Sequence, residues 1–311
     1  MSTRAQLAEL IDKLRKAREI ALDLEYHSYR TYSGFVCLMQ ISTREEDWIV
    51  DPFELRDELE DLNEIFTNPD IVKASRILIH ATTSADVWQV LHGADSDVVW
   101  LQQDFNLYLV NLFDTFHASK VLEFPRHGLA TLLEMYCDFS PDKRYQLADW
   151  RIRSVFRCKW ACITPDMLSR PLSEEMFKYA RADTHFLLYV YDNLRNALLD
   201  RAVSRSASPT TSRAGSPTAP DAFVREVLSR SAETALRTYS PEPYDAEGGA
   251  GSNGWDTLAR RWNKPALGID GVPGVQREVF RVVHMWRDRV AREEDESTGW
   301  ALSLLQILFQ G

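Results

Sequence analysis

Four carboxylates and one tyrosine occupy positions from which they could hold metal ions around a phosphodiester bond. Asp23 and Glu25 form a D-x-E pair inside an apolar run, and Asp97 follows a second strand-like run. Tyr179 and Asp183 are four residues apart in a helix-like segment. Side chains two apart in a strand share a face, as do side chains four apart in a helix, so each pair converges. Two hard divalent cations need several carboxylate oxygens and would stabilise the attacking and leaving oxygens of phosphodiester hydrolysis.

Asp23 gives the strongest physical signal among these acids. It lies in the apolar run 20–24, where an unpaired carboxylate would cost several kcal/mol. Each motif alone has an ordinary explanation: a solvated strand edge, a packed helix carrying surface charge, and for Asp97 a favoured helix N-terminus. The three ordinary explanations are less convincing when the motifs are considered together, because an α/β sheet can bring all three motifs to one place. The Tyr179 hydroxyl near the attacking water could orient it or help to remove its proton.

The surrounding pattern predicts an α/β domain with a mixed sheet flanked by helices. Strands come first, and strands and helices then alternate along the chain, which is typical of this class. Period-two runs predict an antiparallel meander of three strands, over 20–25, 35–41 and 47–51. Further apolar patterns predict helices over 4–19, 52–66, 96–105, 129–136 and 173–200, and strands from 71 onward and over 110–113.

Composition narrows the class of protein. With 45% hydrophobic and 26% charged residues, the chain of 311 residues has the composition of a soluble globular protein. No apolar run approaches the ~20 residues of a membrane span, and no signal peptide is evident. The four cysteines form no disulfide framework and indicate a reducing compartment. A net charge of −10 argues against a broad basic nucleic-acid surface, but not against a nuclease whose acids bind Mg²⁺.

The organisation along the chain predicts two units joined by a linker. Residues 1–200 contain all the candidate catalytic motifs. Residues 201–221 are rich in Ser and Pro and predict a flexible linker. Residues 222–311 contain helix-like stretches and predict a second, helical region.

Six stretches within residues 5–200 resemble the DEDD-type 3'-5' exonucleases of the RNase D class. Within that class the chain is most similar to the nuclear exosome-associated, PM/Scl autoantigen-type exoribonucleases. The resemblance implies an RNase H-like fold, two Mg²⁺ or Mn²⁺ ions, and release of nucleoside 5'-monophosphates from single-stranded RNA 3' ends. It also implies exosome core subunits as partners, a nuclear location and a role in rRNA and other RNA processing and decay. The matching stretches are 21–25, 36–44, 91–97, 111–115, 145–151 and 179–185.

In the family pattern, the metal-site acids fall on Asp23, Glu25, Asp97 and Asp183, and the catalytic tyrosine falls on Tyr179. The second region resembles this family too, since 255–265 and 279–298 are similar to the approach to, and first helix of, an HRDC domain. That module normally has several more helices, so residues 222–311 are expected to form an incomplete, all-α HRDC-like region.

A basic and aromatic stretch, 143–153, is expected to contact RNA phosphates and bases. The alternative for this stretch is a packed loop with solvated arginines. The candidate substrate-binding residues are His92, Lys143, Gln146, Trp150 and Arg151.

Two segments, 74–89 and 154–169, interrupt the family pattern. They are hypothesised to be translated introns or gene-model errors, and the alternative is genuine surface loops, which cost little stability. Within the first segment Asp86 imitates Asp97, and in another strand register Asp86 would replace it near the metals. The complete motif over 92–100 favours Asp97.

The leading hypothesis is therefore a metal-dependent 3'-5' exoribonuclease. Two alternatives remain open on the sequence alone: a Werner-type 3'-5' DNA exonuclease, and a catalytically impaired RNA-binding or exosome scaffold protein.

Overall fold

The computed structural model describes eight stretches of the chain. Contacts divide the chain into two compact units, of which the first comprises Met1–Tyr26 with Val36–Thr238, and the second His27–Phe35 with Tyr239–Gly311. The described stretches are 1–67, 88–146, 148–150, 172–206, 219–241, 243–251, 254–261 and 274–301.

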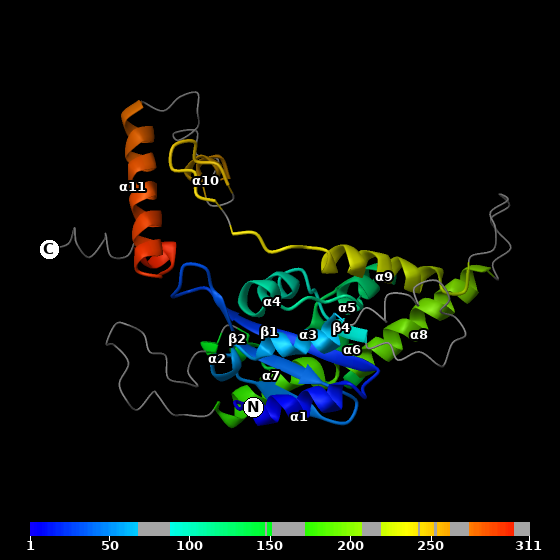
Figure 1. Cartoon of the computed structure of the whole chain (residues 1–311). Helices are drawn as coiled ribbons and strands as arrows, with labels where there is room; N and C mark the ends of the chain where they lie inside the picture. Colours follow the sequence, from blue (N-terminus) through cyan, green and yellow to red (C-terminus); the bar gives the residue numbers. More distant parts are fainter. Residues whose placement is uncertain are drawn as a thin grey trace. The chain divides into compact units, whose positions relative to one another are not determined.

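A five-stranded mixed sheet forms the centre of the first unit, with strand order β3-β2-β1-β4-β5. β2 and β3 pair antiparallel, whereas β4 pairs parallel with both β1 and β5. The mixed sheet that the sequence predicts is thus confirmed, and helices flank it (Figure 1). The strands are β1 (Glu19–His27), β2 (Phe35–Ser42), β3 (Asp47–Val50), β4 (Trp88–Leu91) and β5 (Leu112–Asp114).

β1 alternates between two hydrophobic cores. Ile20, Leu22 and Leu24 join the core that contains α1, and Ala21 joins the core that contains α8. Because strand side chains alternate, Asp23 shares the face of Ala21. The D-x-E pair is therefore directed away from the first core, as its spacing predicts.

The helices of the first unit begin and end as follows: α1 (Arg4–Leu14), α2 (Pro52–Leu55), η1 (Leu59–Leu62), α3 (Asn63–Phe66), α4 (Asp97–Phe105), α5 (Thr115–Val121), α6 (Leu129–Cys137), η3 (Lys143–Tyr145), α7 (Glu174–His185), α8 (Leu187–Ser206) and α9 (Ala222–Ala235).

Three helix predictions need correction. The predicted helix 4–19 ends at Leu14, because β1 pairs with β4 from Glu19 onward. The predicted helix 52–66 consists of three short helical pieces, although Leu55, Leu59 and Leu62 are all buried as its period requires. The predicted helix 173–200 is interrupted at Phe186, which separates α7 from α8.

The predicted strand from 71 onward lies largely outside the described residues. β4, the strand that leads to His92, begins at Trp88, inside the segment 74–89 that interrupts the family pattern. Asp86 and the whole of 154–169 also lie outside the described residues.

α9 belongs to the first unit, although it follows the predicted linker. It packs on β5, α5 and α8, and Phe223 and Val227 bury its apolar face in the core that contains α8. The contacts thus place the division between units after Thr238, whereas the sequence predicts it at 201–221.

The second unit combines the tip of the β1–β2 hairpin with α10 (Trp255–Arg261) and α11 (Gly274–Glu293). Arg30 in the hairpin tip forms a two-pronged ion pair with Glu296, and the Tyr32 hydroxyl donates to Asp288 at 2.8 Å. The HRDC-like character of this unit stays a prediction. Over the part of the chain that the structure describes, no helix combines the length and apolar character needed to cross a bilayer.

Candidate metal centre

Three carboxylates from two elements converge in the first unit. Asp23 and Glu25 come from β1 and Asp183 comes from α7, and one carboxylate oxygen of each lies within 4.8 Å of the others. The D-x-E pair that the sequence predicts thus meets Asp183, one member of the predicted helical pair.

α7 is held in place by the edge of the sheet. Arg181 Nε donates to Asp47 Oδ2 at 2.7 Å, and His185 Nδ1 lies 2.8 Å from the same oxygen. The hydroxyls of Ser42 and Thr184 are 2.7 Å apart in a buried contact. Because Asp47 begins β3 and Ser42 ends β2, these bonds fix the turn of helix that contains Asp183.

The surroundings of the three acids disfavour their ionised forms. Burial, then repulsion by Asp183, raises the pKa of Asp23 well above its usual range. Burial, followed by repulsion from Asp23, Asp183 and Asp97, raises the pKa of Glu25 to about 10. Burial raises the pKa of Asp183 to about 7. Burial and mutual repulsion outweigh the hydrogen bonds that lower the pKa values of Asp23 and Glu25, and the main influences on the three groups include no cationic side chain.

Asp97 lies beside this cluster. It begins α4, is 8% exposed, and its pKa is raised by burial and then by the charge of Asp23. Its charge in turn acts on Glu25. Asp97 therefore belongs to the same electrostatic site, although it lies outside the group of three that share the 4.8 Å limit.

Tyr179 stands one helical turn before Asp183, with its ring centre 5.9 Å from Tyr145 and 6.0 Å from Trp150. Burial, then repulsion from Asp183, Glu25 and Asp23, raises the pKa of the Tyr179 hydroxyl. The hydroxyl thus keeps its proton at neutral pH and can donate a hydrogen bond.

The candidate substrate-binding residues lie in different places. Trp150 is 3% exposed and borders Tyr179, whereas Gln146 is exposed. Lys143 begins η3, and Arg151 lies outside the described residues. The ring of His92 is not in the acid cluster: its Nδ1 lies 2.9 Å from Thr115 Oγ1. Burial lowers its pKa to about 4, so the ring is neutral at neutral pH.

A cavity of about 490 Å³ opens beside Tyr179. It combines aromatic rings, on which bases can stack, with cationic side chains. Its lining includes Phe139, Tyr145, Phe186, Lys178, Arg181 and His185.

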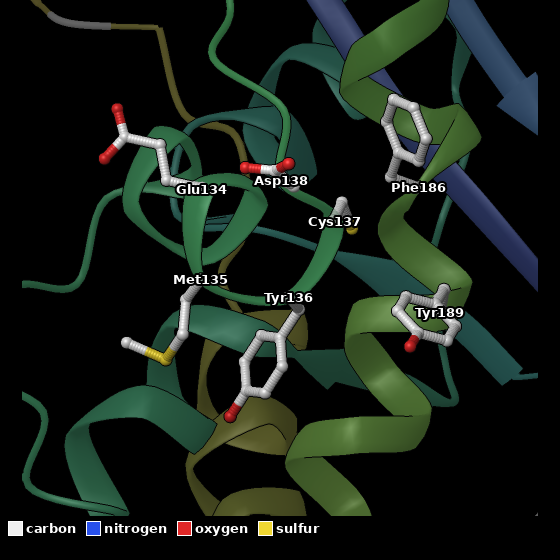
Figure 2. A pocket seen from close by; sticks show the side chains of 7 residues that line it. All are labelled: Glu134, Met135, Tyr136, Cys137, Asp138, Phe186 and Tyr189. Atoms are coloured by element: carbon white, nitrogen blue, oxygen red, sulfur yellow. The ribbon is translucent and has the colours of Figure 1, made fainter.

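A second hollow, of about 650 Å³, lies over α6 and the first turn of α8 (Figure 2). Glu134 on α6 and Asp138 at its end contribute carboxylates to it. Its lining is completed from the other side by Phe186, between α7 and α8, and by Tyr189 on α8 (Figure 2). The cavity beside Tyr179 is also lined by two carboxylates, those of Asp142 and Glu175, but it alone of the two has cationic side chains in its lining, so it is the better candidate for nucleic acid.

Sequence reasoning missed the residues that support the cluster. His185 lies within the family stretch 179–185, and this was the available signal for it. Asp47 had no signal, because its role depends on the packing of α7 against β3.

The donor set fits divalent metal ions. All of its ligand atoms are carboxylate oxygens, which are the ligands that hard cations such as Mg²⁺ and Mn²⁺ prefer. The raised pKa values point the same way, since a cation would restore the ionised forms that burial disfavours.

Comparison with known proteins shows which family this chain is similar to. The exosome complex exonuclease RRP6 of Saccharomyces cerevisiae is 41% identical over 298 residues, covering 96% of this chain and 33% of that protein. The exosome complex component 10 of Homo sapiens is 39% identical over 302 residues, covering 97% of this chain and 27% of that protein. The solved catalytic core of RRP6 from Trypanosoma brucei has 34% identity and a TM-score of 0.69, covering 96% of this chain and 65% of that one.

This chain spans a third or less of the yeast and human relatives. A family model described as 3'-5' exonuclease matches residues 1–199, which contain the whole acid cluster. The chain belongs to the 3'-5' exonuclease family.

Proposed function

We propose that the chain is a two-metal 3'-5' exoribonuclease that releases nucleoside 5'-monophosphates. The observation that supports this most is the half-buried cluster of Asp23, Glu25 and Asp183, in which the acids raise one another's pKa values. A family fold alone does not define a reaction, but this cluster matches the ligand needs of phosphodiester hydrolysis.

The residues have distinct roles in this proposal. Asp23, Glu25, Asp97 and Asp183 would hold two ions, with Mg²⁺ or Mn²⁺ the best fit, and these supply Lewis acidity and an ionised water. The protonated hydroxyl of Tyr179 orients the attacking water by donating to it or to the scissile phosphate.

RNA would approach through the cavity beside Tyr179. Its rings accept stacked bases, and Lys178 and Arg181 add positive charge, although Glu174 and Asp47 offset part of it. Lys143, Gln146, Trp150 and Arg151 are our candidates for contacts with the RNA. For His92, the bond to Thr115 favours an indirect contribution, through the loop that leads to Asp97.

The biological setting is proposed from the named relatives. Two of them are described as an exosome exonuclease and an exosome component. We infer that this chain acts with exosome core subunits in the nucleus, on rRNA and other RNA, and that its second unit is an HRDC-like region.

The test uses purified protein, single-stranded RNA labelled at its 5' end, and Mg²⁺. The expected result is stepwise shortening from the 3' end, with nucleoside 5'-monophosphates as products, and loss of both with chelator or with Asp183→Asn. The matched control is Glu226→Gln, which removes the charge of an exposed acid that is paired with Arg230 outside the site.

Two outcomes would replace the proposal. Equal or faster hydrolysis of DNA of the same sequence would indicate a DNA exonuclease. RNA binding without hydrolysis at saturating metal would indicate a catalytically impaired scaffold.

A further inference from the structure

The loop that leads into Asp97 is anchored from beneath by a buried aspartate. Asp114, at the end of β5, is 1% exposed. Its Oδ1 accepts from the Gly93 N–H at 2.8 Å and its Oδ2 from the Ala94 N–H at 3.0 Å. Gly93 has a φ of +70°, a conformation that side chains other than glycine rarely adopt. The backbone N–H groups of Gly93 and Ala94 thus both point to Asp114, which fixes the conformation of this turn.

α9 bonds to the same place from the other side. The backbone N–H of Asp114 donates to Ser231 Oγ at 3.0 Å, and Ser231 is fully buried. Near the end of α9, Thr234 Oγ1 donates to Asp95 Oδ1 at 3.3 Å, and the Arg237 guanidinium lies 2.9 Å from the same oxygen. α9 thus contacts both the support of the loop and the loop itself, two residues before Asp97.

Neighbouring groups keep these donors aligned. The Thr234 hydroxyl has one proton, which goes to Asp95, so His117 Nε2, 3.1 Å away, donates to it. Gln102, on the helix that Asp97 begins, donates to the Arg237 carbonyl at 2.8 Å. The end of α9 is therefore bonded to the loop and to α4 together.

Asp97 begins α4 two residues after Asp95, so the backbone that is bonded to α9 is the backbone that carries this candidate ligand. Groups that orient a metal ligand contribute to the affinity of the site for the metal.

We propose that α9 is a positioning element of the metal centre, which holds the loop 93–96 so that Asp97 faces Asp23 and Glu25. This inference rests on the proposed function of the acid cluster. α9 lies beyond residues 1–199, which match the family model. In this proposal it follows the predicted linker in sequence but supports the metal centre of the exonuclease unit.

The test removes the bonds from α9 to the loop and measures metal affinity. Thr234→Val with Arg237→Gln removes the hydroxyl donor and the charged donor from Asp95 and keeps the volume of the buried Thr234 side chain. The matched control is Arg230→Gln on the same helix, whose partner Glu226 lies on the exposed face. Asp95→Asn is the second variant, since it weakens the same bonds from the loop and leaves α9 intact.

Two measurements are made on the full chain: the Mg²⁺ concentration that gives half-maximal RNA hydrolysis, and Mn²⁺ binding without RNA, from the electron paramagnetic resonance signal of free Mn²⁺. In the double variant, both the half-maximal Mg²⁺ concentration and the dissociation constant for Mn²⁺ should rise about tenfold, as for other groups that orient metal ligands. Both values should also rise in Asp95→Asn, and saturating metal should restore hydrolysis in both variants.

Metal affinity equal to that of Arg230→Gln would overturn the inference, even if the unfolding temperature fell, because α9 would then be only a structural support. A wild-type chain that binds no Mn²⁺ and releases no nucleotide would overturn the proposed function, and this inference with it. A wild-type chain that does both, with double-variant constants like those of the control, would overturn the role of α9 alone.

Discussion

The first unit contains two kinds of carboxylate below its surface, and they differ in what the protein places around them. Asp114 accepts hydrogen bonds from three backbone N–H groups. Burial raises the pKa of Asp47, but bonds from Ser42, Arg181 and His185 outweigh this, and its pKa lies below the ordinary value. The chain itself supplies the donors that these acids need.

Asp23, Glu25 and Asp183 have the opposite surroundings. They face one another, and burial and mutual repulsion raise the pKa values of Asp23 and Glu25. Asp47 and Asp114 show that this fold can supply hydrogen-bond donors to an acid. The acids that repel one another are therefore where we propose that an external cation binds, and the contrast supports this proposal better than the cluster alone.

The largest expected effect separates the two kinds of acid by activity. Asp23→Asn removes a proposed metal ligand and should lower the rate of RNA hydrolysis by about 10³-fold or more. Asp47→Asn makes the same chemical change in an acid that supports α7 but is not a proposed ligand, and it should lower the rate far less. Single-turnover rates at saturating Mg²⁺ measure both. Similar losses in the two variants would remove the distinction.

The next effect concerns Tyr179, whose hydroxyl borders the cluster without joining it. Tyr179→Phe should reduce the single-turnover rate by about 10²-fold, the usual contribution of a positioned proton donor. Metal affinity should stay at the wild-type value, because the phenol is not expected to be a ligand. A weakened Mn²⁺ affinity in this variant would show that Tyr179 instead supports the metal ligands.

The third effect is a pH dependence of the metal-free protein. Asp183, with a pKa raised to about 7, keeps a proton in the folded state that the unfolded chain releases at about pH 4. Folding is therefore favoured at low pH, and stability falls as pH rises through this window, by about 1–3 kcal/mol. Urea unfolding in the presence of chelator measures it. A rise in stability over the same window would contradict the raised pKa of Asp183.

The smallest expected effect concerns Asp47, whose bonds to α7 support the structure. Asp47→Asn weakens the bonds from Arg181 and His185 and should reduce the free energy of unfolding by about 1–2 kcal/mol, because both partners are partly exposed. Thermal unfolding of the metal-free protein is the measurement. Full stability in this variant would show that α7 does not depend on its bond to β3.

The residues differ in how far their roles could be predicted from sequence. Asp23 and Glu25 converge because strand side chains have a period of two, and Tyr179 and Asp183 because helix side chains meet after four residues. These local rules succeed in the structure. They contain no information about which strand α7 rests on, so the role of Asp47 could not be foreseen.

Longer-range features were harder to predict for the same reason. α9 follows a Ser/Pro linker, and its sequence does not reveal that Ser231 and Thr234 return to the loop before Asp97. The broken helix over 52–66 keeps its apolar residues buried, so period alone could not distinguish it from a continuous helix. Packing between distant elements decides both features.

The central claim is that the cluster of Asp23, Glu25 and Asp183 is complete only with metal, and thermal unfolding tests it most directly. Wild type and Asp183→Asn are compared at about pH 8, with chelator and with saturating Mn²⁺. The account predicts a crossing: the variant unfolds at the higher temperature without metal, because Asp183 is ionised at this pH against the effect of burial and the variant lacks that charge, and the wild type unfolds at the higher temperature with Mn²⁺. If the wild type is the more stable protein without metal, and Mn²⁺ leaves both unfolding temperatures unchanged, the cluster is not a metal centre.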